Sequence, residues 1–63
     1  MHITIQFDTD NAAFEDNAGV EALHIGTQIA RRIETAIEAK QDGKYVLRDS
    51  NGNLIGWVIT EAD

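Results

Sequence analysis

The chain of 63 residues contains no cysteine and no long uncharged apolar run. The absence of cysteine excludes a disulfide framework and a thiolate metal site. The longest apolar runs have only a few residues, which is too short for a membrane-spanning helix. The opening residues Met1-His2-Ile3-Thr4 lack a basic region followed by an apolar one, so we expect no secretory signal.

Basic residues are scarce and unevenly placed. Residues 1–30 contain no Lys or Arg, and the chain carries a net charge of −6. The five basic residues all lie in the second half: Arg31, Arg32, Lys40, Lys44 and Arg48. The first half would repel a phosphate backbone, because nucleic-acid affinity rests on basic contacts. We therefore expect no direct binding of DNA or RNA. An acidic surface is suited to binding a basic protein partner, or it only keeps the protein soluble.

The residues that are present predict one small folded domain over residues 1–63. Hydrophobic residues make up 43% of the chain and charged residues 25%, which is typical of a folded soluble protein. His2–Phe7 alternates between apolar and polar side chains, and this period of two predicts a half-buried strand. Residues 8–17, rich in Asp and Asn, form an acidic connection. Within it, Ala12, Ala13 and Phe14 are expected to make one helical turn.

Residues 18–41 are predicted to form a long amphipathic helix, with Asp16 or Asn17 as its N-cap. One broad apolar stripe contains Ala22, Ile25, Gly26, Ile29, Ala30, Ile33, Ala36 and Ile37. Gly26 lies in the middle of this stripe, where the absence of a side chain would allow close approach to a sheet. Gly43 is expected to stop the helix at its C-terminal end.

Residues 44–60 are predicted to form a hairpin of two strands, 44–49 and 54–60. A type I turn followed by Gly52 in the left-handed region would give a three-residue loop with a bulge. That register places an aromatic-rich set on one face: Tyr45, Leu47, Ile55, Trp57 and Ile59. A two-residue Asn51-Gly52 loop would shift the pairing and group Tyr45 and Leu47 with Leu54 and Val58. We prefer the first register because it collects one core face.

These elements predict an α+β fold of order β-α-β-β, with one amphipathic helix packed on one face of a three-stranded sheet. The last strand is the most apolar, which favours a central place for it. The helix covers only one face, so Val46, Leu54 and Val58 would stay partly exposed on the other. We interpret these three as a candidate oligomer face and expect a homodimer or higher oligomer.

Residues able to carry out catalysis are few. Asp8-Thr9-Asp10-Asn11 resembles the start of a calcium loop, but the pattern fails after two ligands. The hydroxyl of Ser50 lies in the hairpin turn, where Asp49 is better placed to cap the turn than to activate a nucleophile. We therefore expect no enzyme activity, no catalytic residue, no cofactor and no metal.

Two stretches carry a resemblance that covers nearly the whole chain. They are Asp8-Thr9-Asp10-Asn11-Ala12-Ala13-Phe14-Glu15-Asp16 and the Asp-x-Asn-Gly-Asn-x-x-Gly pattern of residues 49–56. With these motifs the chain resembles small acidic phage and prophage accessory proteins, a group that includes anti-CRISPR and other anti-defence inhibitors. The resemblance implies a phage protein acting in the cytoplasm of a bacterial host. It brings no agreed catalytic or binding residues.

The resemblance further implies a protein that binds and blocks a bacterial defence protein or nuclease complex without catalysis. Combined with the charge, it suggests an acidic surface that mimics phosphates against an arginine-lined groove. The residues that we assign to this partner-binding surface are Asp8, Asp10, Glu15, Asp16 and Glu21.

Other interpretations stay open. The chain is also consistent with a homo-oligomeric module that sequesters a nucleotide signal through Arg31, Arg32 or Arg48. A phage accessory or assembly protein with no defence role is a further alternative. The interpretation of the acidic stretch as only a solvated, capped turn also stays open.

Overall fold

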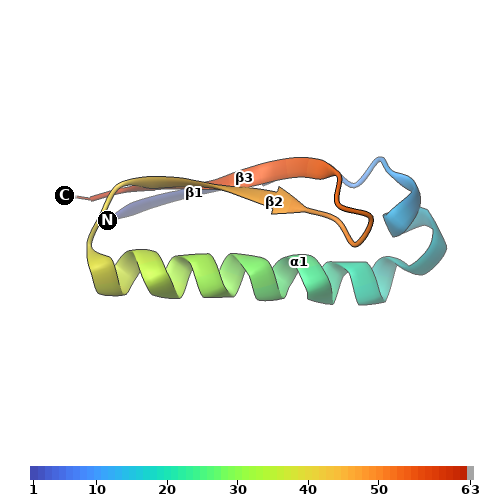
Figure 1. The fold of residues 1–63 in the computed structure, drawn as a ribbon, viewed down its shortest axis with the longest axis horizontal. Helices are drawn as coiled ribbons and strands as arrows, with labels where there is room; N and C mark the ends of the chain where they lie inside the picture. Colours follow the sequence, from blue (N-terminus) through green and yellow to red (C-terminus); the bar gives the residue numbers. More distant parts are fainter. Residues whose placement is uncertain (63) are drawn as a thin grey trace.

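The computed structural model describes residues 1–62 and contains one helix and three strands. Their order is β1 (His2–Phe7), α1 (Ala12–Ala39), β2 (Gly43–Arg48) and β3 (Leu54–Glu61). The sheet order is β1-β3-β2 with both pairings antiparallel, and α1 runs along one face of the sheet (Figure 1). The predicted α+β architecture and the central place of the last strand are confirmed. No helix within residues 1–62 combines the length and apolarity needed to cross a membrane.

The helix is longer at its start than predicted and shorter at its end. The predicted turn at Ala12–Phe14 is present and is continuous with the long helix, apart from a kink at Asn17. Asn17 has φ −158° and ψ 67°, outside the helical region but within α1. The N-cap of α1 is Asn11, so the predicted N-cap at Asp16 or Asn17 is wrong, because the helix already begins at Ala12. At the other end Lys40 takes the left-handed conformation, and its N–H donates to the Ala36 carbonyl at 2.9 Å. Gly43, the predicted stop, instead begins β2.

The β2–β3 loop has the predicted form. The N–H of Gly52 donates to the Asp49 carbonyl, the N–H of Asp49 donates to the Asn53 carbonyl, and both distances are 3.0 Å. Gly52 has a φ of 83°, in the region that favours glycine. These contacts make a three-residue loop closed by an Asp49–Asn53 pair.

The predicted strand register is nevertheless wrong. Leu47 lies opposite Gly56, whereas Arg48 lies opposite Leu54, so Ile55 is an extra residue at a bulge in β3. Beyond the bulge Tyr45 pairs with Val58 and Val46 with Trp57. Tyr45 therefore shares the helix-facing side with Val58, and Trp57 lies on the opposite side of the sheet. The bulge also lets Ile55 and Val58, three positions apart, join the same core.

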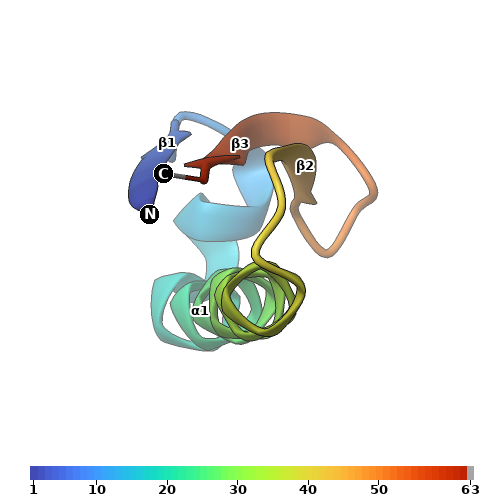
Figure 2. The same cartoon turned by 90° about the vertical axis from the view of Figure 1, so that its left-hand side faces the viewer.

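The core lies between α1 and the β2–β3 side of the sheet. Its buried members are Phe14, Ile25, Leu47, Ile55 and Val58, with Ile3, Ile29, Ile33 and Tyr45 packed against them. Because α1 packs chiefly on β2 and β3, part of its apolar stripe stays exposed, including Ala22, Gly26 and Ile37. A Cβ on Gly26 would meet no atom within 4 Å, so the prediction that this glycine allows close approach to the sheet is wrong. Figure 2 shows β1 at the side of the sheet farther from β2.

Candidate functional site

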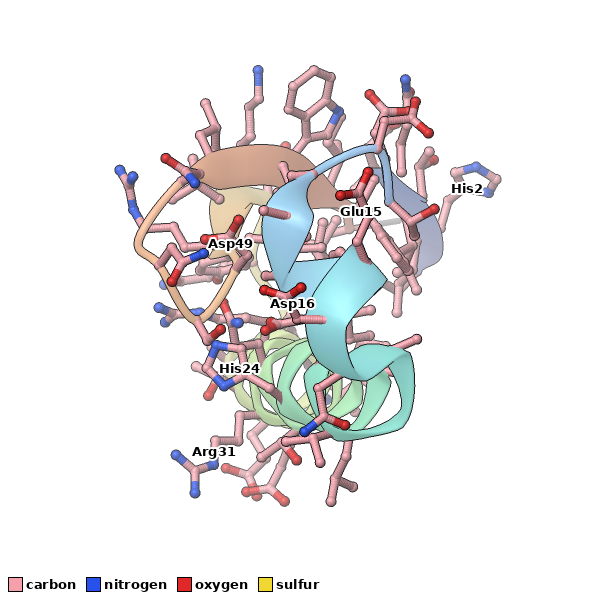
Figure 3. The ribbon with its side chains drawn as sticks, turned by 90° about the vertical axis from the view of Figure 1, so that its right-hand side faces the viewer. His2, Glu15, Asp16, His24, Arg31 and Asp49 are labelled. Atoms are coloured by element: carbon pink, nitrogen blue, oxygen red, sulfur yellow. The ribbon has the colours of Figure 1, made fainter. Side chains whose placement is uncertain are left out.

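Four exposed carboxylates lie at one end of the molecule, and we call them the acidic end: Asp8, Asp10, Glu15 and Asp16. They belong to the β1–α1 connection and to the beginning of α1, at the end that also holds the β2–β3 loop (Figure 1). Figure 3 looks onto this end and shows Glu15 and Asp16 there. Within residues 1–62 none of the four carboxylates has an ion-pair or hydrogen-bond partner.

The backbone that carries the acidic end is fixed at both of its ends. The N–H of Asp8 donates to the Ile55 carbonyl at 3.0 Å, which extends the β1–β3 pairing beyond Phe7. The buried ring of Phe14 anchors the first helical turn of α1 in the core. The charged groups are therefore presented from an ordered segment.

Glu21, the fifth acid assigned to this surface, is not on it. Its side chain is only 3% exposed, and its carboxylate accepts hydrogen bonds from the N–H of Ser50, at 3.0 Å, and from the Ser50 hydroxyl. The helix directs Glu21 toward the β2–β3 loop, whose backbone donors need an acceptor. The predicted place of Glu21 on the exposed acidic surface is therefore wrong, because this carboxylate is buried and joins α1 to the hairpin.

Asp49 fixes the loop from within. Its carboxylate accepts the N–H of Asn51 at 2.9 Å, the N–H of Asn53 at 2.8 Å and the side-chain amide of Asn53 at 3.2 Å. Burial raises the pKa of Asp49, but the hydrogen bonds from Asn53 and Asn51 and the nearby charge of His24 outweigh it. The pKa of Asp49 therefore lies below its ordinary value. The sequence interpretation of Asp49 as the turn cap is confirmed.

The neighbouring Ser50 serves the same loop. Its hydroxyl donates to Glu21, which also accepts the Ser50 N–H, so the serine locks the turn to the helix. A hollow of about 330 Å³ adjoins this contact, with Asp16 and His24 among its lining residues. No three His, Asp or Glu side chains within residues 1–62 are arranged to hold a metal ion.

The candidate oligomer face is only partly as predicted. Val46 and Leu54 are exposed, but Val58 is completely buried, because the shifted register turns it toward α1. Its expected place on the outer face is therefore wrong. Trp57 lies there instead, opposite Val46, with the Lys44 ammonium 4.7 Å from the centre of its ring.

Two of the three arginines proposed to hold a nucleotide interact with the chain itself. The Arg32 guanidinium lies 5.3 Å from the centre of the Tyr45 ring, and Arg48 donates to the Gly52 carbonyl at 3.0 Å. Arg31 is exposed on the helix. Nothing in these contacts favours a nucleotide site.

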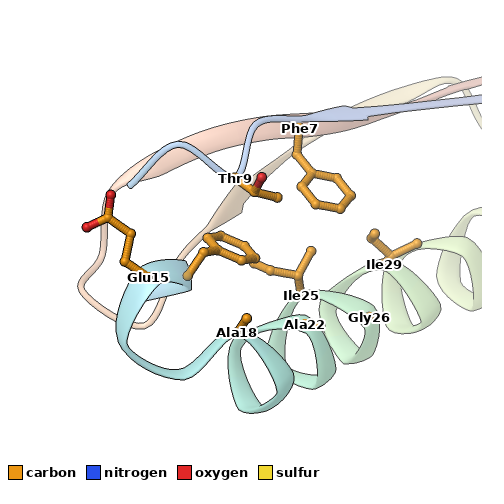
Figure 4. A pocket seen from close by; sticks show the side chains of 9 residues that line it. Phe7, Thr9, Glu15, Ala18, Ala22, Ile25, Gly26 and Ile29 are labelled. Atoms are coloured by element: carbon orange, nitrogen blue, oxygen red, sulfur yellow. The ribbon is translucent and has the colours of Figure 1, made fainter. Parts of the chain in front are cut away.

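The structure contains an apolar groove that the sequence analysis did not identify. It lies between β1 and α1, has a volume of about 500 Å³ and is shown in Figure 4. Its lining residues are Phe7, Thr9, Phe14, Glu15, Ala18, Ala22, Ile25, Gly26 and Ile29. The sequence contained a signal for this groove: the apolar stripe of α1 is wider than two strands of a small sheet can cover.

Comparisons of the chain with known protein families, with curated proteins and with solved structures found no match.

Proposed function

We propose that the chain is a non-catalytic inhibitor whose acidic end occupies a basic, nucleic-acid-holding groove of a bacterial defence nuclease. The observation that carries the proposal is the set of four exposed carboxylates that have no cation among the described residues. Carboxylates of this kind lose no internal ion pair on binding, so each is free to pair with an Arg or Lys of the partner. Complementary charge of this sort speeds association and selects the partner.

The ordered backbone supports the same proposal. A segment that is already fixed by the Asp8 contact and by Phe14 loses little conformational freedom when it binds. The choice of a defence nuclease as the partner rests on the resemblance to phage accessory proteins. The choice of its nucleic-acid groove rests on charge, because such grooves carry the Arg and Lys residues that phosphates require.

The test compares two variants that remove the same charge from different places. The first replaces the acidic end: Asp8→Asn, Asp10→Asn, Glu15→Gln and Asp16→Asn. The control neutralises four other acids, all exposed, in the same way: Glu34→Gln, Glu38→Gln, Asp42→Asn and Glu61→Gln. Each variant is added to bacterial RNA-guided nucleases, and cleavage of target DNA is measured over a range of salt concentrations.

We expect the unaltered chain and the control variant to inhibit at least one nuclease in competition with DNA, and more weakly as salt rises. The acidic-end variant should fold normally by circular dichroism and fail to inhibit. Equal inhibition by both variants would exclude phosphate mimicry by the acidic end. Absence of inhibition by the unaltered chain across the nucleases would contradict the defence role.

A further inference from the structure

The outer edge of β1 is an open strand edge. β1 pairs only with β3. The N–H of Asp8 bonds to β3, and bonding residues alternate along an antiparallel ladder. Ile3, Ile5 and Phe7 therefore direct their backbone N–H and C=O groups toward the open side. The strand HITIQF contains no proline and no Asp, Glu, Lys or Arg, and its pairing with β3 has no bulge. Such an edge is competent to pair with another strand.

The opposite edge of the sheet, along β2, is protected. The side-chain amide of Gln28 donates to the Arg48 carbonyl at 2.7 Å and accepts the Arg48 N–H at 3.2 Å. The helix thus satisfies backbone groups that a further strand would use. Lys44 and Arg48 add charges along β2, which disfavour pairing with another strand. Of the two sheet edges within residues 1–62, the one along β1 combines a strand free of Asp, Glu, Lys and Arg with backbone groups that no further strand pairs.

Apolar surface continues from the open edge toward the helix. Phe7 is 37% exposed and lies over the groove shown in Figure 4. At the other end of β1 a second hollow of about 400 Å³ is lined by Met1, Ile37, Lys40 and Ala62. The two hollows flank the two ends of the same strand. The helix packs chiefly on β2 and β3, so the β1 side of the sheet stays uncovered.

We propose that two copies of this chain form a symmetric dimer in which β1 pairs antiparallel with β1 of the partner. The two sheets then join into one, and the two-fold axis, perpendicular to the sheet, places both helices on the same face. The exposed flank of each helix, marked by Ala22, Gly26 and Ile37, faces the flank of the other over the joined β1 strands.

A second copy is the occupant that this surface fits best. A strand that pairs with this edge should match β1 in length, carry no charged side chain and place apolar side chains on the helix side. The β1 strand of a second copy meets all three requirements. Antiparallel pairing also brings opposite charges together. Glu15 lines the groove at one end of β1 and Lys40 lines the hollow at the other, and the two-fold axis sets each beside the other in the partner. Asp8, Asp10 and Asp16 line neither hollow and stay available to the basic partner of the proposed function.

The first test measures mass in solution by light scattering, with two matched variants. Ile5 and Val46 are β-branched residues of the two edge strands and are 43% and 44% exposed, but they lie on opposite faces of the sheet. The unaltered chain should be a dimer at about 100 µM, where even a weak specific pairing with micromolar Kd is saturated. Ile5→Lys should weaken dimerisation at least about 100-fold, because a symmetric interface carries every substitution twice. Val46→Lys should leave the dimer intact.

A monomeric unaltered chain would overturn the proposal. So would a dimer that Val46→Lys dissociates and Ile5→Lys does not, because the outer face would then be the interface. If Ile5→Lys unfolds, Ile37→Lys takes its place, since Ile37 is 54% exposed on the helix flank. A dimer that survives Ile37→Lys would then contradict the proposed pairing.

Amide hydrogen exchange on the unaltered chain provides a second test that needs no substitution. The N–H groups of Ile3, Ile5 and Phe7 should be protected in the dimer and exchange faster on dilution into the monomer. The amides of Thr4 and Gln6, which bond to β3, serve as internal controls and should respond much less to dilution. A dimer whose Ile3, Ile5 and Phe7 amides exchange at the same rate as in the monomer would refute pairing through β1.

Discussion

Gly56 is the position at which a single methyl group should damage this fold most. It lies in β3, opposite Phe7 of β1 and Leu47 of β2. A Cβ on Gly56 would lie 2.0 Å from the Gln6 carbonyl oxygen, 2.5 Å from the Phe7 Cα and 2.6 Å from the Phe7 Cβ. Two of these atoms belong to the backbone, so no side-chain rotation relieves the overlap. In Gly56→Ala, β1 must move away from β3.

The size of the effect follows from the strand that is displaced. Overpacking of a core costs about 1–3 kcal/mol where side chains can adjust, and a displaced backbone adds lost pairing between β1 and β3. We expect Gly56→Ala to lower the free energy of unfolding by about 3 kcal/mol or more. The free energy of unfolding of a folded protein is about 0.05–0.15 kcal/mol per residue, which for 63 residues is roughly 3–9 kcal/mol. The variant should therefore lose about a third or more of its total stability, and β1 should be the element that detaches.

The assay is urea unfolding followed by Trp57 fluorescence and circular dichroism, at one fixed protein concentration. Gly19→Ala is the matched control, because a Cβ there would meet no atom within 4 Å and the residue is helical. That substitution should stabilise the chain by about 0.5 kcal/mol. The steric reasoning is refuted if Gly56→Ala unfolds within about 0.5 kcal/mol of the unaltered chain.

Two further predictions concern the contacts that fix the β2–β3 loop. Glu21→Ala should destabilise the fold by about 1.5–3 kcal/mol, because the buried carboxylate accepts two hydrogen bonds from Ser50, whereas Glu38→Ala, at an exposed helical position, should leave the urea midpoint nearly unchanged. The pKa of Asp49 is lower in the folded state than the ordinary 3.8, so its contribution to stability is complete above that pH and is lost as pH falls through the folded value. Urea midpoints measured between neutral and strongly acidic pH should show this loss, and Asp49→Asn should flatten the acidic part of the curve.

The sequence by itself determined the local structure. Alternation over residues 2–7 and helical periodicity over residues 18–41 predicted β1 and most of α1, since each pattern buries its apolar side only in one conformation. The loop chemistry of Asp49 and Gly52 was also predictable, because a side-chain acceptor and a left-handed residue act within a few positions of each other.

The register and the burial of single residues were decided by tertiary structure. The extra residue Ile55 in β3 shifts the pairing, and its place in the core exists only once α1 lies above the sheet. For that reason Trp57 lies on the outer face and Val58 is buried, the reverse of the predicted arrangement. Whether Glu21 is a surface acid or a buried acceptor likewise depends on which flank of α1 meets the loop of residues 49–53.

The candidate sites also divide into one that the local sequence predicts and one that only the tertiary structure creates. The sequence placed Asp8, Asp10, Glu15 and Asp16 together because they are close along the chain. The groove between β1 and α1 joins Phe7 to Ala22 and Gly26, residues that no local pattern relates. It exists because a single helix packed on β2 and β3 is too narrow to cover a third strand as well, and that mismatch is a property of how whole elements pack.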